Sequence, residues 1–374
     1  MHVFAVIARK YGQRFLSAIG LSLIMASPLA AAPSRIDQTE RCDVLVVGGG
    51  LAGVATAYES LHAGRTVCLT EMTDWLGGQL TSQGTTALDE ARMQRQLQFY
   101  AAGYKELRRR VLEHYGRQNP GDCWVSAVCF LPADAHDILV DMLEQAARDG
   151  DGQLKWFPST VVKEVDVQGA MIGGAIAIQH RPAPGTPPLN TEPLSAFLED
   201  AYRYEDSERL SKQIIRFQPS GHEGPADWYV VEATETGEVI ALSGVPYRLG
   251  LDPKSYLNPS SPTFTGDAYC TQGFTYTFAM ERTESPQPAE RPSYYDIYAP
   301  YFSFEREREN TNYIDFVFTY RRLLAPGKRP EKRIFGVSDL KPGAISMQTW
   351  PWGNDYPPCT SVHNLIYSPD PLNR

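Results

Sequence analysis

Three glycines and one glutamate near the start of the chain have the types and spacing needed to bind a dinucleotide. Gly48, Gly50 and Gly53 form the pattern G-x-G-x-x-G directly after the mainly apolar residues 42–47. In this pattern the first glycine permits a tight turn, the second lets the backbone approach a pyrophosphate, and the third lets a helix pack against a strand. Glu71 follows a second apolar run, at roughly the 20-residue spacing at which an acid binds a ribose hydroxyl.

The elements that must position these residues are a strand over residues 42–47, a helix that begins near residue 51, and a strand over residues 66–70. We expect Leu51 and Ala52, at the start of the helix, to present backbone N–H groups and the positive end of the helix dipole to the phosphates. The other interpretation of the glycines is an ordinary structural turn.

A pair of glycines, Gly77 and Gly78, follows Glu71 in the sequence Leu-Gly-Gly-Gln-Leu-Thr-Ser-Gln-Gly. This segment is similar to the G-G-x-L-T-x-x-G segment of the FAD-dependent oxidoreductase family, among glutathione-reductase-like flavoproteins with two dinucleotide folds. The resemblance implies a Rossmann-like α/β FAD-binding domain, with FAD as the cofactor. It also implies that the two glycines approach the pyrophosphate and the flavin, and that Gln79 and Leu80 lie near the isoalloxazine. A surface turn is the other interpretation.

Further segments carry the same resemblance. Residues 227–238 resemble the strand and Ala-Thr-Gly motif that returns the chain to the nucleotide domain, with two additional residues before the glycine. Val161 and Val162 stand where such proteins give a backbone contact to adenine, and plain strand packing is the alternative. Residues 348–356 resemble a W-P-x-G-N-D-Y segment of the family. No later segment resembles the one that closes the FAD site near the family's C-terminus, so we expect a truncated chain.

The composition is that of a globular protein, with 43% hydrophobic residues and a net charge of −9. The negative charge disfavours nucleic acids and anionic membranes as partners. Residues 1–32 have a basic start, a largely apolar run and small residues at 30–32, which predicts a secretory signal peptide. We therefore expect export to the periplasm or the extracellular space. An uncleaved membrane anchor is the alternative, and the sequence carries no signal for the oligomeric state.

The chain has six cysteines. Cys42 and Cys68 lie on the two strands predicted for the nucleotide domain, and we expect them to be buried apolar fillers. Cys123 and Cys129 lie in a loop, where a structural disulfide is favoured over a redox dithiol because the spacing is not C-x-x-C. Free thiols are the third alternative for this pair. No Cys and His cluster has the spacing of a metal site.

The order of predicted elements gives the domain organisation. Residues 40–165 and 226–250 form the FAD-binding domain, and helices over 91–115 and 132–149 belong to its helical segment at 91–149. His136, on the second of these helices, is expected to be structural or exposed. Residues 166–225 form an insertion that completes a hairpin over 160–179 and continues with a Pro-rich connector and a polar helix over 194–216. Residues 251–374 form a β-rich substrate domain, inserted in the fold and truncated.

These predictions lead to an FAD-dependent oxidoreductase that transfers hydride from a small organic substrate to flavin N5. Arg248 and Tyr247 are the candidates for substrate contact, and a structural ion pair is the alternative for Arg248. No catalytic acid or base is assigned. An NAD-dependent dehydrogenase is the first alternative, although Gly77 and Gly78 have no role in it. A non-catalytic or truncated exported scaffold that keeps the nucleotide fold is the second alternative.

Overall fold

In the computed structural model the described residues are 35–191, 194–221, 228–259, 261, 264–268, 277–288, 290–298, 318–326 and 341–348. The chain divides into two units, Met1–Ser34 and Arg35–Arg374. The first unit lies outside the described residues and contains the predicted signal peptide.

A parallel four-stranded sheet forms the centre of the nucleotide-binding part. Its strand order is β4 (Gln153–Phe157), β3 (Thr66–Thr70), β2 (Val44–Val47) and β8 (Tyr229–Glu232), and every neighbouring pair is parallel. All four residues of β2 are buried, as expected for a strand covered on both faces. The predicted Rossmann-like α/β fold is therefore confirmed.

Helices pack against one face of this sheet, in an apolar cluster that contains residues of β2 and β3. α1 (Leu51–His62) connects β2 to β3 and packs against α4 (Pro132–Gly150), which leads into β4. The prediction of a helix over 132–149 is confirmed, and Pro132 stands in its first turn, where proline is tolerated. The predicted helix over 91–115 is two helices, α2 (Arg92–Leu97) and α3 (Ala102–Tyr115), because Gln98 adopts a left-handed conformation with φ of 52°.

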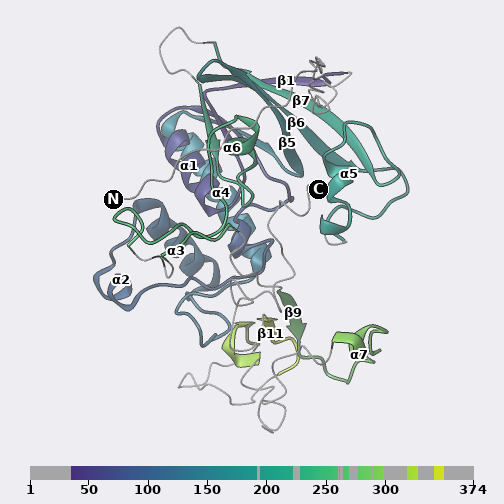
Figure 1. Ribbon diagram of the computed structural model, residues 1–374. Coiled ribbons are helices and arrows are strands. Elements are labelled where there is room, and N and C mark those ends of the chain that lie inside the picture. The colour runs from purple at the N-terminus through teal and green to yellow at the C-terminus, as the bar shows by residue number, and fades with distance from the viewer. Residues whose placement is uncertain are drawn as a thin grey trace, which may run out of the picture. The chain divides into compact units, whose positions relative to one another are not determined.

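A second four-stranded sheet covers the other face, with the order β1 (Gln38–Cys42), β7 (Leu210–Pro219), β6 (Met171–Pro182) and β5 (Thr160–Gln168). Figure 1 shows these strands side by side. The β5–β6 hairpin confirms the predicted turn after Gln168. Residues from the two sheets meet in one apolar layer, which includes Leu45, Phe157, Val162, Ile215 and Phe217.

The predicted polar helix over 194–216 is wrong. The structure has a short 3-10 helix η2 (Leu194–Ala196), one turn α5 (Leu198–Ala201) and then β7. Ile214, Ile215 and Phe217 of β7 are fully buried. Ile215 and Phe217 pack in the apolar layer between the two sheets, whereas Ile214 packs in a separate apolar cluster. This segment forms a strand and not a helix because β7 pairs with a neighbouring strand on each side, parallel with β1 and antiparallel with β6.

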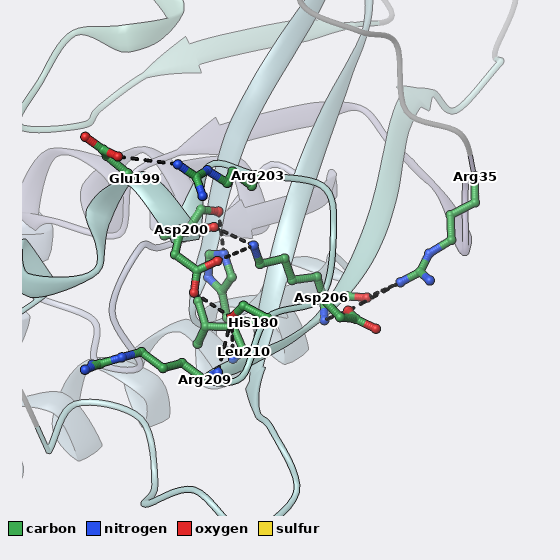
Figure 2. Close-up of polar contacts among 11 residues, drawn as sticks. Arg35, His180, Glu199, Asp200, Arg203, Asp206, Arg209 and Leu210 are labelled. Carbon is green, nitrogen blue, oxygen red and sulfur yellow. Dashed lines mark hydrogen bonds and ion pairs between the residues drawn. The ribbon is translucent and has the colours of Figure 1, made fainter.

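A buried lysine fastens the α5 segment to this sheet. Lys212 of β7 has a fully buried side chain, and its Nζ donates to Asp200 Oδ1 (2.9 Å) and to Asp200 O (2.5 Å). His180 of β6 lies beside Asp200 in Figure 2, and its Nε2 is 2.7 Å from Ala201 O. The ion pair compensates the burial of the lysine charge, which would otherwise oppose folding.

The described cysteines form two disulfides. Cys123 and Cys129 pair, which confirms the prediction of a structural disulfide in this loop. Cys42 and Cys68 also pair, with 5.9 Å between their Cα atoms, so the prediction that they are separate apolar fillers is wrong. The cause is Asp43, which exchanges hydrogen bonds with the backbone of Thr66 at 2.8 Å in both directions and so aligns residue 42 with β3. Among the described cysteines none is free.

The remaining described elements are short. They are η1 (Gly78–Leu80), α6 (Glu238–Leu242), β9 (Phe278–Glu281), α7 (Tyr295–Tyr298), β10 (Arg322–Leu324) and β11 (Ile345–Gln348). β10, β11 and β9 form an antiparallel sheet within the region predicted as the substrate domain. It lies next to the glycine-rich loop, because Thr277 Oγ1 donates to Gln83 O at 2.8 Å. Residues 349–356 of the W-P segment lie outside the described residues.

Candidate functional site

The turn from β2 into α1 can only be built with glycine. Gly48 has φ of +101°, and a Cβ atom there would lie 2.4 Å from Ala233 O. A Cβ atom on Gly53 would lie 1.8 Å from Gly48 O. Gly50 caps α1, whose first turn contains no acid, and Leu51 and Ala52 are exposed. The predicted residues thus form a helix N-terminus that is open to an anion.

The second glycine pair packs directly on the first. Gly77, with φ of +111°, donates its N–H to Gly49 O at 2.8 Å. Gly78 has φ of +51°, and a Cβ atom there would lie 3.0 Å from Gly50 Cα. Two loops that are distant in sequence therefore meet at the start of α1 with no room for side chains. Gln79 follows in η1 and is exposed.

Glu71 stabilises the glycine turn through a hydrogen bond that its carboxylate accepts from the turn. Its Oε2 accepts the N–H of Gly49 at 2.7 Å, and its Oε1 accepts the N–H of Thr73 at 3.0 Å and the Thr73 hydroxyl at 3.1 Å. Burial raises the pKa of Glu71 despite these hydrogen bonds. The carboxylate lies at the carboxyl end of β3, where the spacing placed it, and the role of binding a ribose stays a prediction.

Sequence reasoning missed the acids that β8 and its following turn bring to the same place. A cavity of about 60 Å³ at the carboxyl ends of β2 and β3 is lined by Gly50, Glu71, Gly78, Glu235 and Glu238, among others. Oε1 of Glu235 would lie 3.5 Å from a Cβ atom on Gly50 and 3.4 Å from one on Gly78. Its carboxylate therefore stands over both glycines. The signal for it was the pair of additional residues in Ala-Thr-Glu-Thr-Gly.

Glu238 is held differently from Glu235. Its Oε2 accepts the hydroxyl of Tyr202 at 2.5 Å, and burial raises the pKa of Glu238. Glu235 is an exposed side chain. Glu235 can thus turn into solvent at little cost, whereas Glu238 is fixed by its contacts.

Three predicted residues lie apart from this cavity. The Val162 side chain is 1% exposed and packs between the two sheets, while Thr160 of the same strand lines the cavity. Arg248 donates to Asp252 Oδ1 at 2.7 Å and is largely exposed, as in the alternative of an ion pair. Tyr247 is also exposed. Neither Arg248 nor Tyr247 is among the residues that line the cavity.

The described part of the chain offers neither a metal site nor a membrane-spanning helix. No group of three or more His, Cys, Asp or Glu side chains in this part of the chain is placed to bind a metal ion. None of the helices in it combines the length and the apolar character needed to cross a bilayer.

The sequence matches one family model, described as FAD dependent oxidoreductase, over residues 43–183. Over these residues the chain is similar to the FAD-dependent oxidoreductase family. The match begins at Asp43, just before β2, and includes the glycine turn, the Gly77–Gly78 loop and the β5–β6 hairpin. The family indicates FAD as the cofactor and an oxidoreductase as the class of enzyme, which disfavours the NAD-dependent alternative. No curated protein matches the sequence.

The chain also aligns with parts of solved structures at low identity. THI4 of Thermovibrio ammonificans is 13% identical, with a TM-score of 0.31, over 60% of this chain and 75% of that one. OxyS anhydrotetracycline hydroxylase of Streptomyces rimosus is 14% identical, with a TM-score of 0.29, over 57% and 36%. A flavoprotein/dehydrogenase of Cytophaga hutchinsonii is 16% identical, with a TM-score of 0.30, over 57% and 44%. The alignment thus spans less than half of the last two proteins, and at TM-scores this low these likenesses support no further statement.

Proposed function

We propose that this chain is an exported flavoprotein that binds FAD at the start of α1 and oxidises a small organic substrate. The observation that carries the proposal is the contact between the two glycine loops, Gly48–Gly50 and Gly77–Gly78, over a helix N-terminus without acids. Any side chain on Gly50 or Gly78 would fill this cradle. A pyrophosphate needs such close approach to backbone N–H groups.

The roles of the residues follow from this arrangement. The N–H groups of the first turn of α1, at Leu51 and Ala52, bind the pyrophosphate. Glu71 keeps the turn in shape through Gly49 and is the candidate to bind the ribose. The order of Glu71 and then a glycine pair supports a glutathione-reductase-like subclass. When bound, the flavin supplies the redox chemistry by accepting a hydride at N5.

Export is supported by the two disulfides together with the signal peptide predicted at residues 1–32. Both disulfides are buried, and such bonds persist mainly in oxidising compartments. The substrate is proposed to be a small molecule, and Arg248 and Tyr247 remain the predicted contacts for it. The domain limits also remain as predicted, with a substrate domain over 251–374.

The test of the proposed function is an absorption spectrum of the full chain, purified from an oxidising compartment, incubated with FAD and desalted. We expect retained bands near ~375 and ~450 nm, which are those of an oxidised flavin. Incubation with NAD instead of FAD is the control for the dehydrogenase alternative. A folded protein that stays colourless would instead favour the non-catalytic scaffold.

Replacing the exposed carboxylate over the cradle should improve cofactor binding. A pyrophosphate at Gly50 and Gly78 carries negative charge next to Glu235. Glu235→Gln is therefore expected to lower the Kd for FAD about fivefold, since one repulsion between charges a few ångströms apart in water is worth about 1 kcal/mol. Titration of flavin fluorescence measures the Kd. Glu59→Gln, an exposed change of the same charge on α1, is the matched control and should leave the Kd unchanged. An equal effect of both variants would show that only net charge matters.

A further inference from the structure

A histidine of α4 holds the loop that carries the second glycine pair. Nδ1 of His136 accepts the N–H of Leu76 at 3.0 Å. The imidazole also stacks on Trp75, with ring centroids 6.0 Å apart and planes only 9° from parallel. Leu76 is 1% exposed and directly precedes Gly77. The histidine thus contacts two consecutive residues just before the glycine pair.

The next turn of the same helix contacts the glycine pair itself. Leu139 lies three residues after His136, so both side chains point from one face of α4. A Cβ atom on Gly77 would lie 2.8 Å from Leu139 Cδ1. Leu139 therefore limits the loop by shape alone, whereas His136 fixes it by a hydrogen bond that depends on protonation. Within this pair of contacts, only the histidine can respond to pH.

We propose that His136 is a positioning residue for the cofactor, whose unprotonated Nδ1 keeps the Gly77–Gly78 loop in the conformation that binds FAD. This inference rests on the proposed FAD-binding function. Protonation of Nδ1 would place an N–H opposite the N–H of Leu76, so the hydrogen bond would be lost and the two donors would repel each other. The loop would then lose its polar attachment to α4, and the affinity for FAD would fall with pH.

The surroundings of His136 determine the direction of the pH effect. Burial lowers its pKa below the ordinary value, while Asp137 of α4 and Asp74 of the loop act in the opposite direction. The contribution of the neutral imidazole is therefore fully present above about pH 6.5, the value for an unfolded histidine. It is lost as the pH falls through the lower pKa of the folded state. Binding of FAD should be constant near neutrality and weaken only on acidification.

Two substitutions separate the hydrogen bond from the rest of the histidine. In His136→Asn the amide oxygen takes the place of Nδ1 and can accept the same N–H, but it does not titrate. In His136→Leu no acceptor remains, and the buried N–H of Leu76 loses its partner. His180→Asn is the matched control. Burial lowers the pKa of His180 as it does that of His136, but His180 lies on β6 of the other sheet and its ring contacts Ala201 of α5.

The experiment is a titration of FAD into the full chain and the three variants from pH 8 to pH 5, with unfolding of the cofactor-free proteins over the same range. The wild-type Kd for FAD should rise about tenfold on acidification. The His136→Leu variant should have, at every pH, a Kd about tenfold higher than that of the wild type at neutral pH. The His136→Asn variant should have the wild-type Kd at pH 7.5, and its Kd should change less with pH. His180→Asn should keep the wild-type Kd and its profile. A wild-type Kd that does not change with pH, or a His136→Leu Kd equal to that of the wild type, would rule out the role proposed for His136. Either result would leave the proposed FAD-binding function intact. If the wild type binds no FAD at any pH, the proposed function falls and this inference falls with it.

Discussion

Alanine in place of Gly53 is expected to destabilise the protein by about 3 kcal/mol or more and to abolish the retention of FAD. The added Cβ atom would lie 1.8 Å from Gly48 O, and this neighbour is backbone in the tightest part of the turn. Either α1 must move away from β2 or the turn must open, and overpacking of this kind is among the larger effects of single substitutions. Chemical unfolding and the flavin bands after desalting measure the two effects.

Gly103→Ala is the matched control for this substitution. Gly103 lies in the first turn of α3, as Gly53 does in α1, and a Cβ atom there would make an ordinary contact of 3.4 Å with the Tyr58 ring. Because alanine favours a helix over glycine by up to about 1 kcal/mol, this variant should be neutral or slightly more stable. Full FAD retention by Gly53→Ala would contradict the close packing of α1 on the turn.

Loss of the Cys42–Cys68 disulfide is also expected to lower the free energy of unfolding strongly. The two residues are 26 apart in sequence, and the entropy of closing a loop of this length corresponds to about 3.5 kcal/mol. The double variant Cys42→Ala/Cys68→Ala should lose about this much free energy of unfolding. Denaturant unfolding under oxidising conditions measures it.

The second disulfide provides the comparison. Cys123 and Cys129 are 6 apart, and the same relation gives about 2 kcal/mol for their removal. Both pairs are fully buried, so the loss of packed sulfur atoms is similar in the two double variants. If removing the Cys123–Cys129 disulfide cost as much free energy of unfolding as removing the Cys42–Cys68 disulfide, the stabilisation would not come from restriction of the unfolded chain.

The sequence predicted the nucleotide-binding unit well because its determinants are local. The turn from β2 to α1 is specified by glycines within six residues, and at Gly48 and Gly53 a side chain would collide with the backbone. β7 was missed because its pattern is irregular. Lys212 occupies a buried position, paired with Asp200, and Ile214 and Ile215 are both buried, so the alternation of a strand is interrupted twice. Only the fold shows that this lysine has a partner.

The candidate site shows the same limit. Gly48, Gly50, Gly77 and Gly78 could be predicted because their conformations are encoded at their own positions. The place of Glu235 depends on how the turn after β8 meets two other loops, and the two additional residues before Gly237 mark the turn without revealing that geometry. His136 was expected to be structural or exposed, and it is structural, but its partner lies 60 residues away in sequence. The pairing of Cys42 with Cys68 likewise depends on the contacts of Asp43 with Thr66.

The Cys42–Cys68 bond makes the first part of the fold a covalent ring. The ring contains β2, the glycine turn, α1 and the exposed residue Arg65 before β3, while Glu71 lies just outside it on the Cys68 side. A protease that cut the backbone at Arg65 would leave the glycine turn and Glu71 in one molecule, joined through sulfur. For a protein proposed to work outside the cell, the part that binds the cofactor is thereby protected against separation by a single cut.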